Sequence, residues 1–234
     1  IIAGEPNSIS SEIIFKSWQS RNKYKHKPFF IIGSFQLLNS QMKKLKYYIK
    51  IKKIDKTFNI KNLSKKELYI YDVKYSQKNI FENVSSRSNK YVLKCFDIAS
   101  KLANKKKIAG FINCPVTKEF LFKKKHQGIT EYLAKKESIK NDGVMLIYNS
   151  QLSVSPLTKH ISISQVSRKI NKFEIVNKIK IINSFYKKYF FKKPNFALLS
   201  LNPHNYYDSK EKKIKKEIET AIKILKKQKI NIKG

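Results

Sequence analysis

Histidines are the residues best suited to chemistry in this sequence, and two of the four directly follow predicted strands. His204 comes after the apolar run 195–201, which suits a strand buried on both faces, and Pro203 breaks that strand. His160 follows the second strand of a predicted hairpin. If both strands belong to one sheet, the two imidazoles meet at the same edge, where they could bind a divalent metal. By spacing alone, two ordinary loop histidines remain the simpler interpretation.

Other polar residues are weaker candidates. Thr130 opens a predicted helix after Gly128, so its hydroxyl and nearby amides suit a phosphate, although a simple helix cap explains it equally well. The turn at 4–6 could offer backbone N–H groups to an anion, yet it lacks the glycine-rich dinucleotide fingerprint. Cys114 could be a nucleophile, but no histidine can be assigned to it, and we expect a structural role. Cys95 has the spacing of a helix's buried face.

The elements that must position these residues alternate along almost the whole chain. Strand patterns cover residues 1–3, 29–32, 47–54, 68–73, 108–113, 144–148, 151–157 and 195–201. Helical patterns cover residues 10–21, 34–44, 89–105, 116–124, 128–136, 163–170, 172–191 and 211–227. We predict that 108–113 is a buried strand and that a two-residue turn, Asn149-Ser150, joins the strands of the hairpin. The alternation favours a mostly parallel sheet with helices on both faces.

The bulk composition limits the class of protein. With 234 residues, of which 41% are hydrophobic, the chain can bury one large core or two small ones. Its net charge of +35 would suit nucleic acid, but nearly all of it is scattered lysine, and the only arginines are Arg21, Arg87 and Arg168. We therefore expect a solvated lysine surface and no nucleic-acid partner. No apolar run is long enough to cross a bilayer, and we expect a cytoplasmic protein without a membrane partner.

Taken together, five short motifs resemble the 4-hydroxythreonine-4-phosphate dehydrogenase family of pyridoxal phosphate biosynthesis in order and spacing. The resemblance extends over essentially the whole chain, and the motifs at Thr130 and His204 are its most specific parts. The motifs are Gly4-Glu5-Pro6, Ile112-Asn113-Cys114-Pro115-Val116-Thr117-Lys118, Gly128-Ile129-Thr130-Glu131, Thr158-Lys159-His160 and Leu201-Asn202-Pro203-His204.

The resemblance implies an α/β fold with two α/β/α domains of the isocitrate/isopropylmalate dehydrogenase-like type, working as a homodimer. We expect a first domain at residues 1–124 and a second at 125–234 that carries the metal ligands. Because 230–234 reads as the start of a further strand or turn, we expect a fold that is incomplete at the C-terminus, with the first domain completed by a later segment.

The implied activity is a metal-dependent, NAD- or NADP-linked oxidation and decarboxylation of 4-phosphooxy-threonine to 3-amino-2-oxopropyl phosphate, in vitamin B6 synthesis. In the family three histidines hold a divalent metal, and two of them map onto His160 and His204, while the substrate-binding threonine maps onto Thr130. Imidazole ligands suit Zn²⁺ or Co²⁺, and Mg²⁺ would need more oxygen ligands. With the third histidine beyond Gly234, we expect residues 1–234 alone to be inactive.

Two alternatives follow from departures in this sequence. Ile129 stands where family members usually have a histidine, so a paralogous dehydrogenase for another four-carbon phosphorylated hydroxy acid is the first. The second is a non-catalytic basic binding module, suggested by the charge of +35.

Overall fold

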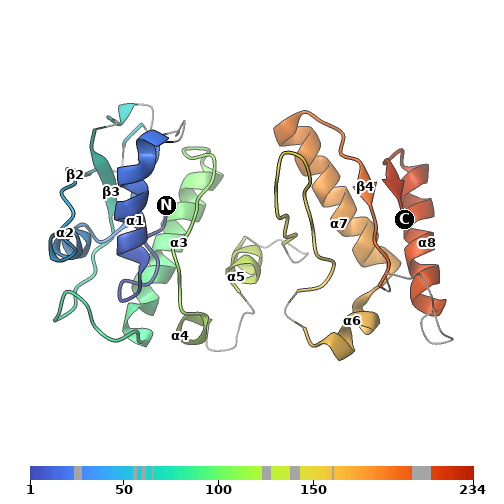
Figure 1. Ribbon diagram of the computed structural model, residues 1–234, viewed down its shortest axis with the longest axis horizontal. Helices are drawn as coiled ribbons and strands as arrows, with labels where there is room; N and C mark the ends of the chain where they lie inside the picture. The colour runs from blue at the N-terminus through green and yellow to red at the C-terminus, as the bar shows by residue number, and fades with distance from the viewer. Residues whose placement is uncertain are drawn as a thin grey trace. The chain divides into compact units, whose positions relative to one another are not determined.

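The computed structural model describes residues 1–23, 28–54, 57–59, 62–64, 66–122, 128–137, 143–159, 161–201 and 212–234. The chain divides into two compact units, Ile1–His126 and Gln127–Gly234 (Figure 1). Each unit combines helices with parallel strands around its own hydrophobic core, which confirms the predicted α/β class.

The first unit is built on a three-stranded parallel sheet with the order β1-β3-β2. Its N-terminal segment extends the sheet, because Ile2 forms parallel bridges with both Ile32 and Asn113. The elements of this unit are α1 (Ser10–Gln19), η1 (Ser20–Lys23), β1 (Ile31–Gly33), α2 (Phe35–Lys44), β2 (Ile51–Lys53), β3 (Leu68–Asp72), η3 (Ser86–Ser88), α3 (Asn89–Asn104) and α4 (Lys118–Phe122).

Helices α1 and α2 pack together against one face of this sheet, while α3 packs against β1 (Figure 1). Ile31 and Ile70, which are partners in the β1–β3 register, belong to the cluster beneath α1 and α2. Ile32 is equally buried but points the other way, because side chains alternate along a strand. The buried cluster consists of Ala3, Ile14, Phe15, Trp18, Ile31, Leu38, Met42, Ile49, Leu68, Ile70 and Cys114.

The prediction that the strand at 108–113 is buried is wrong. Asn113 makes the bridge to Ile2, but Ile112 is 71% exposed. The segment pairs with residues 1–3 on one side, so it forms the margin of the sheet in the described chain, where an apolar side chain can remain exposed.

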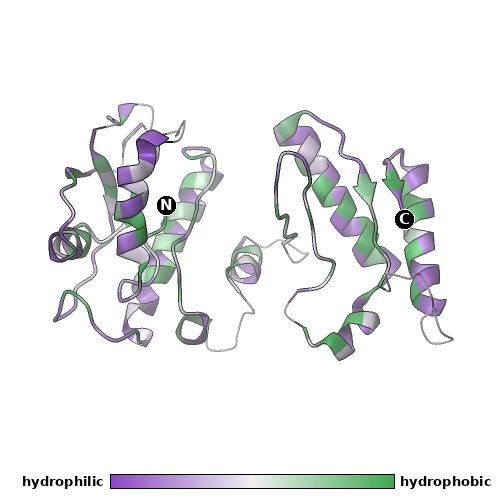
Figure 2. Ribbon diagram, in the orientation of Figure 1, coloured by the Kyte–Doolittle hydropathy of each residue, from purple (hydrophilic) through white to green (hydrophobic). Residues whose placement is uncertain are grey.

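The second unit packs two long helices against a short parallel strand pair. Helices α7 and α8 contact each other, and Figure 2 shows hydrophobic and hydrophilic residues interleaved along both. Strand β4 pairs with β5 through Phe196 and Ile232. The elements are α5 (Ile129–Lys136), α6 (Ile163–Lys169), α7 (Lys172–Phe185), the π-helical turn η4 (Tyr186–Phe190), β4 (Phe196–Ala197), α8 (Lys212–Lys227) and β5 (Ile232–Lys233).

Strand β4 confirms the predicted strand before His204, but the expectation that both of its faces are buried is wrong. Phe196 and Leu198 pack against the cluster formed by α7 and α8, whereas Leu199 is 82% exposed. Because side chains alternate, only one face of this strand meets the helices of the described unit.

The predicted hairpin forms, but with a longer loop than expected. Ile147 and Val154 exchange two backbone hydrogen bonds of 2.8 and 2.9 Å, so six residues, 148–153, lie between the paired residues. A two-residue turn at Asn149-Ser150 would instead pair Ile147 with Leu152. The Asn149 side chain accepts a hydrogen bond from the Gln151 amide, and Ser153 Oγ donates to the Asn149 carbonyl oxygen. These local bonds stabilise the wider loop.

Candidate functional site

The predicted metal ligands His160 and His204 lie outside the described residues, as do His26 and His126. Among the residues that the structure does describe, no group of three or more His, Cys, Asp or Glu side chains could hold a metal ion. The segments that lead to both predicted ligands are described, however, and they can be compared.

These two segments border one hollow in the second unit. The hollow has a volume of about 1150 Å³ and is lined mainly by apolar side chains of the hairpin, α6, α7 and the β4 segment. Its lining includes Thr158, two residues before His160, and Leu201, three residues before His204. The ends of the two predicted strands therefore open onto the same space.

Thr130, the predicted substrate-binding residue, is the second residue of α5, as the sequence indicated. Gly128 is the N-cap, and its carbonyl oxygen accepts the first helical hydrogen bond from the Tyr132 amide, at 3.1 Å. The first N–H groups of a helix have no partner within the helix and carry a partial positive charge. A half-buried threonine at this position can therefore bind a phosphate or carboxylate group.

A lysine with a largely buried side chain, whose contact the sequence did not indicate, joins this helix end to the segment before His160. Lys159 Nζ donates to Glu131 Oε1 and to the Gly143 carbonyl oxygen, both at 2.9 Å. Glu131 is the neighbour of Thr130, and Lys159 is the neighbour of His160. The available signal was a pair of opposite charges, each beside a candidate ligand, but nothing in their spacing of 28 residues indicates contact.

Gly143 makes a second close contact in the same place. A Cβ added to Gly143 would lie 2.9 Å from Thr130 Cγ2. The lack of a side chain at this position therefore lets the chain approach Thr130 more closely than another residue would allow.

The turn at residues 4–6 has a structural role rather than that of an anion site. The Glu5 amide donates to the Pro115 carbonyl oxygen at 2.9 Å, and the buried Glu5 carboxylate accepts hydrogen bonds from the Asn7 amide and from Ser88 Oγ. Gly4 has a φ of +72°, a conformation that glycine adopts readily. The turn thus bonds to its own protein and already contains a negative charge.

Both cysteines are buried, as expected for structural residues. Burial raises the pKa of Cys95 from about 9 to about 12 and that of Cys114 from about 9 to about 11. A nucleophilic cysteine needs a lowered pKa, because the thiolate is the reactive form. Neither thiol is therefore activated, and the structural interpretation of Cys114 is supported.

A second hollow, of about 600 Å³, lies at the carboxyl ends of the strands in the first unit. The Asp72 carboxylate accepts hydrogen bonds from Lys53 Nζ at 2.8 Å and from the Phe35 amide at 3.0 Å. Partial burial alone would raise the pKa of Asp72, but these two donors and the charge of Lys74 outweigh it and lower the pKa. Asp72 thus already supplies an anion at the α2 N-terminus. The hollow is lined by Ser34, Gln36, Lys53, Asp72, Lys74, Tyr75 and Ser76.

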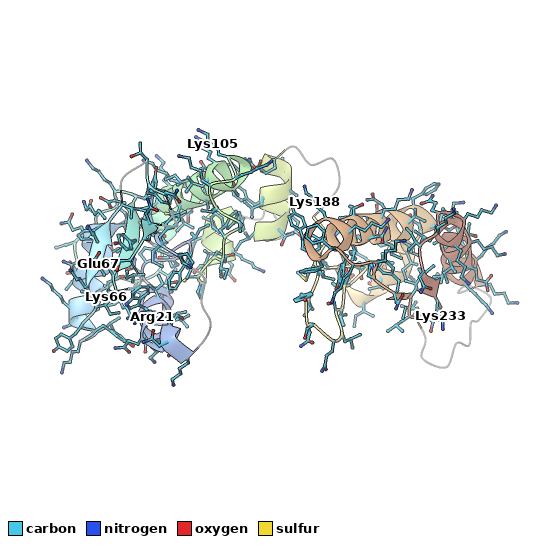
Figure 3. The ribbon with its side chains drawn as sticks, turned by 90° about the horizontal axis from the view of Figure 1, so that it is seen from above. Arg21, Lys66, Glu67, Lys105, Lys188 and Lys233 are labelled. Atoms are coloured by element: carbon cyan, nitrogen blue, oxygen red, sulfur yellow. The ribbon has the colours of Figure 1, made fainter. Side chains whose placement is uncertain are left out.

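The positive charge is spread over both units rather than gathered at this site. Figure 3 shows the labelled Lys105, Lys188 and Lys233 at the periphery of their units, and all three are exposed. The Arg21 guanidinium lies 4.3 Å from the centre of the Trp18 ring and donates to the Trp18 carbonyl oxygen. In the described part of the chain, no helix has the length and apolar composition to cross a membrane.

Comparisons with known proteins agree with this fold. The family model described as pyridoxal phosphate biosynthetic protein PdxA matches residues 25–234. The 4-hydroxythreonine-4-phosphate dehydrogenase of Sulfurihydrogenibium sp. (strain YO3AOP1) is 29% identical over 207 residues, which cover 87% of this chain and 62% of the relative. The D-threonate 4-phosphate dehydrogenase of Salmonella typhimurium is 24% identical, over 87% of this chain and 63% of that protein.

A solved structure shows the same fold. The 4-hydroxythreonine-4-phosphate dehydrogenase of Klebsiella pneumoniae superposes with a TM-score of 0.86 at 23% identity, over 100% of this chain and 73% of that one. The chain thus spans somewhat less than two thirds of the length of the two curated relatives and about three quarters of the solved chain.

Proposed function

Because the chain belongs to the family of the pyridoxal phosphate biosynthetic protein PdxA, we propose that it serves vitamin B6 synthesis as a metal-dependent dehydrogenase linked to NAD or NADP. Its substrate is 4-phosphooxy-threonine, which is oxidised and decarboxylated to 3-amino-2-oxopropyl phosphate. The observation that carries this proposal is the common hollow bordered by the segments that precede His160 and His204.

In this proposal, His160 and His204 supply two ligands to a divalent metal. Neutral imidazoles suit Zn²⁺ or Co²⁺, and Mg²⁺ would need further oxygen ligands. A divalent metal held there would lower the pKa of the substrate hydroxyl and polarise the carbonyl group formed by its oxidation, and NAD or NADP would supply the acceptor for the hydride. We propose that the enzyme is a cytoplasmic homodimer.

The chain's own contribution begins with Thr130. Its hydroxyl can donate a hydrogen bond to an anionic oxygen of the substrate, and the amides at the start of α5 add a partial positive charge. The Lys159 ammonium counters the negative charge of Glu131 beside this position. The helix end therefore remains suited to an anionic substrate despite a carboxylate in its first turn.

Metal removal and histidine replacement test this assignment in the full-length protein. Reduction of NAD or NADP, followed by absorbance, should require 4-phosphooxy-threonine, stop after chelation and recover with Zn²⁺ or Co²⁺. The His160→Ala and His204→Ala variants should no longer bind the metal, as measured by calorimetry. The matched control, His126→Ala, should bind it like the wild-type protein. Undiminished metal affinity in both of the first two variants would contradict the assignment.

A second candidate is a dehydrogenase for another four-carbon phosphorylated hydroxy acid, such as D-threonate 4-phosphate. Ile129, the first residue of α5, places an apolar side chain beside Thr130 that cannot donate a hydrogen bond to the substrate. The Salmonella relative that acts on D-threonate 4-phosphate matches over most of this chain. Measurement of kcat/KM for both substrates decides between the two candidates. A higher kcat/KM for D-threonate 4-phosphate than for 4-phosphooxy-threonine would favour the second candidate.

The non-catalytic basic binding module receives less support from the side chains. Arg21 stacks on Trp18, and Arg87 lies 3.9 Å from Glu82, so both interact within the protein. We propose that the lysines form a solvated surface. Weak binding to nucleic acid that disappears at physiological salt is the expected result of a salt titration, and retention at that salt would favour the binding module.

A further inference from the structure

The side chain of Lys159 is far less exposed than those of three other described lysines that form ion pairs. Only 9% of its side chain is exposed, and its partner Glu131 is 15% exposed. The paired lysines Lys16, Lys50 and Lys53 are between 56% and 77% exposed. Lysine is rarely buried unless it is paired, because transfer of its charge out of water is costly. The contacts of the Lys159 ammonium group are therefore needed to offset the cost of removing its charge from water.

These contacts join three segments that are distant in the sequence. Glu131 belongs to the first turn of α5, Gly143 begins the segment that forms the hairpin, and Lys159 follows the hairpin. The Lys159 ammonium bonds to the other two at 2.9 Å each. One side chain thus fixes where the chain leaves the hairpin relative to the start of α5.

The close contact between Gly143 and Thr130 leaves the 143 segment little room to move toward α5. Thr130 Cγ2 occupies space where a Cβ on Gly143 would be only 2.9 Å away. Any displacement of the 143 segment toward α5 would therefore press on the predicted substrate-binding residue, while Lys159 prevents displacement away from it.

We propose that Lys159 is a positioning residue, whose bonds to Glu131 and to the Gly143 carbonyl set the distance between Thr130 and the chain that enters His160. The proposal rests on the proposed function, in which Thr130 binds substrate and His160 binds metal. The pair also neutralises a carboxylate beside the anionic substrate. Residues that orient metal ligands typically change metal affinity or activity by about 10–100-fold when they are replaced.

Three variants of the full-length protein separate positioning from mere stabilisation. Lys159→Met keeps the length of the side chain but removes its charge, and leaves the largely buried Glu131 carboxylate without this partner. The double variant Lys159→Met/Glu131→Gln removes both charges, so it should recover most of the lost thermal stability and remain folded if the single variant does not. Lys16→Met, which breaks an exposed pair with Glu12 on α1, is the matched control.

The readouts are the Kd for Zn²⁺ alone, measured by calorimetry, and KM and kcat for 4-phosphooxy-threonine. We expect the Kd and the KM to rise about tenfold or more in both variants at Lys159 and to stay within twofold of wild type in the control. The double variant is decisive, because positioning requires that its Kd and KM remain raised although its stability returns.

Two results would overturn the proposal. One is a folded Lys159→Met protein with wild-type Kd and KM, and the other is a double variant in which both constants return to wild type together with stability. If the wild-type protein itself neither binds Zn²⁺ nor turns over the substrate, the proposed function fails and the positioning role fails with it. An active wild type with unaffected Lys159 variants rejects the positioning role alone.

Discussion

Replacing Gly4 with alanine tests how closely the N-terminal turn packs against residues 114–115. With Gly4 at a φ of +72°, a Cβ would lie 2.5 Å from the Pro115 carbonyl oxygen and 2.9 Å from that of Cys114. The left-handed backbone alone costs a non-glycine residue about 1–2 kcal/mol. A shift of Pro115 would also weaken its hydrogen bond from the Glu5 amide, worth about 0.5–1.5 kcal/mol. We expect the free energy of unfolding of the first unit to fall by about 2–3 kcal/mol.

Trp18 provides a probe of this unit, because it is the only tryptophan of the chain and lies in the buried cluster. In urea unfolding followed by its fluorescence, Gly4→Ala should lower the midpoint by roughly 1 M, for a slope of about 1–3 kcal/mol per M. Gly110→Ala is the matched control, since a Cβ there meets no heavy atom within 4 Å. Equal midpoints for the two variants would refute the packing argument.

Three further perturbations concern the site and the thiols. Thr130→Val keeps the branched shape but loses the hydroxyl, so KM for the phosphorylated substrate should rise by about 10-fold or more, while Thr130→Ser stays near wild type in the same kinetic assay. Gly143→Ala places a Cβ 2.9 Å from Thr130 Cγ2 and should raise KM by roughly 3–10-fold, whereas an unchanged KM would show that Thr130 can give way. Burial raises the pKa of Cys95 to about 12 and of Cys114 to about 11, so the folded state holds these protons more tightly than the unfolded state. The stability that the buried, protonated thiols contribute is fully present below about pH 9 and is lost as the pH rises through 11–12. Unfolding midpoints should therefore fall over this range, and they should fall less steeply after both cysteines are replaced by alanine.

The helices could be predicted because their signals are local. Ser34 caps α2, and its Oγ accepts a hydrogen bond from the Leu37 amide at 3.3 Å. Asn171 caps α7 in the same way through the Glu174 amide. A capping residue next to a periodic apolar run indicates where a helix begins without any knowledge of the fold.

Burial and register could not be predicted with the same success, because they depend on what lies opposite a residue. Ile112 and Leu199 belong to apolar runs, and both are exposed in the described chain. A run of apolar residues shows that both faces of a strand are apolar, but it does not show whether other elements cover both faces. Likewise, Asn149-Ser150 is a suitable two-residue turn in composition, but the side chains of Asn149 and Ser153 stabilise a wider loop.

The candidate site combines both kinds of information. Thr130 could be identified from a motif, because the start of a helix after glycine is a local feature and the resemblance to a known family assigns its role. Lys159 could not, because a lysine in a sequence with 51 Lys and Arg residues looks like one more solvated charge. Its partner, Glu131, is 28 residues away, and only the folded chain brings them together. Because an ammonium group that is largely removed from water must keep its hydrogen-bond partners, such a lysine marks a position where the geometry is constrained, and Lys159 bonds to the neighbour of Thr130 and precedes His160 in the chain.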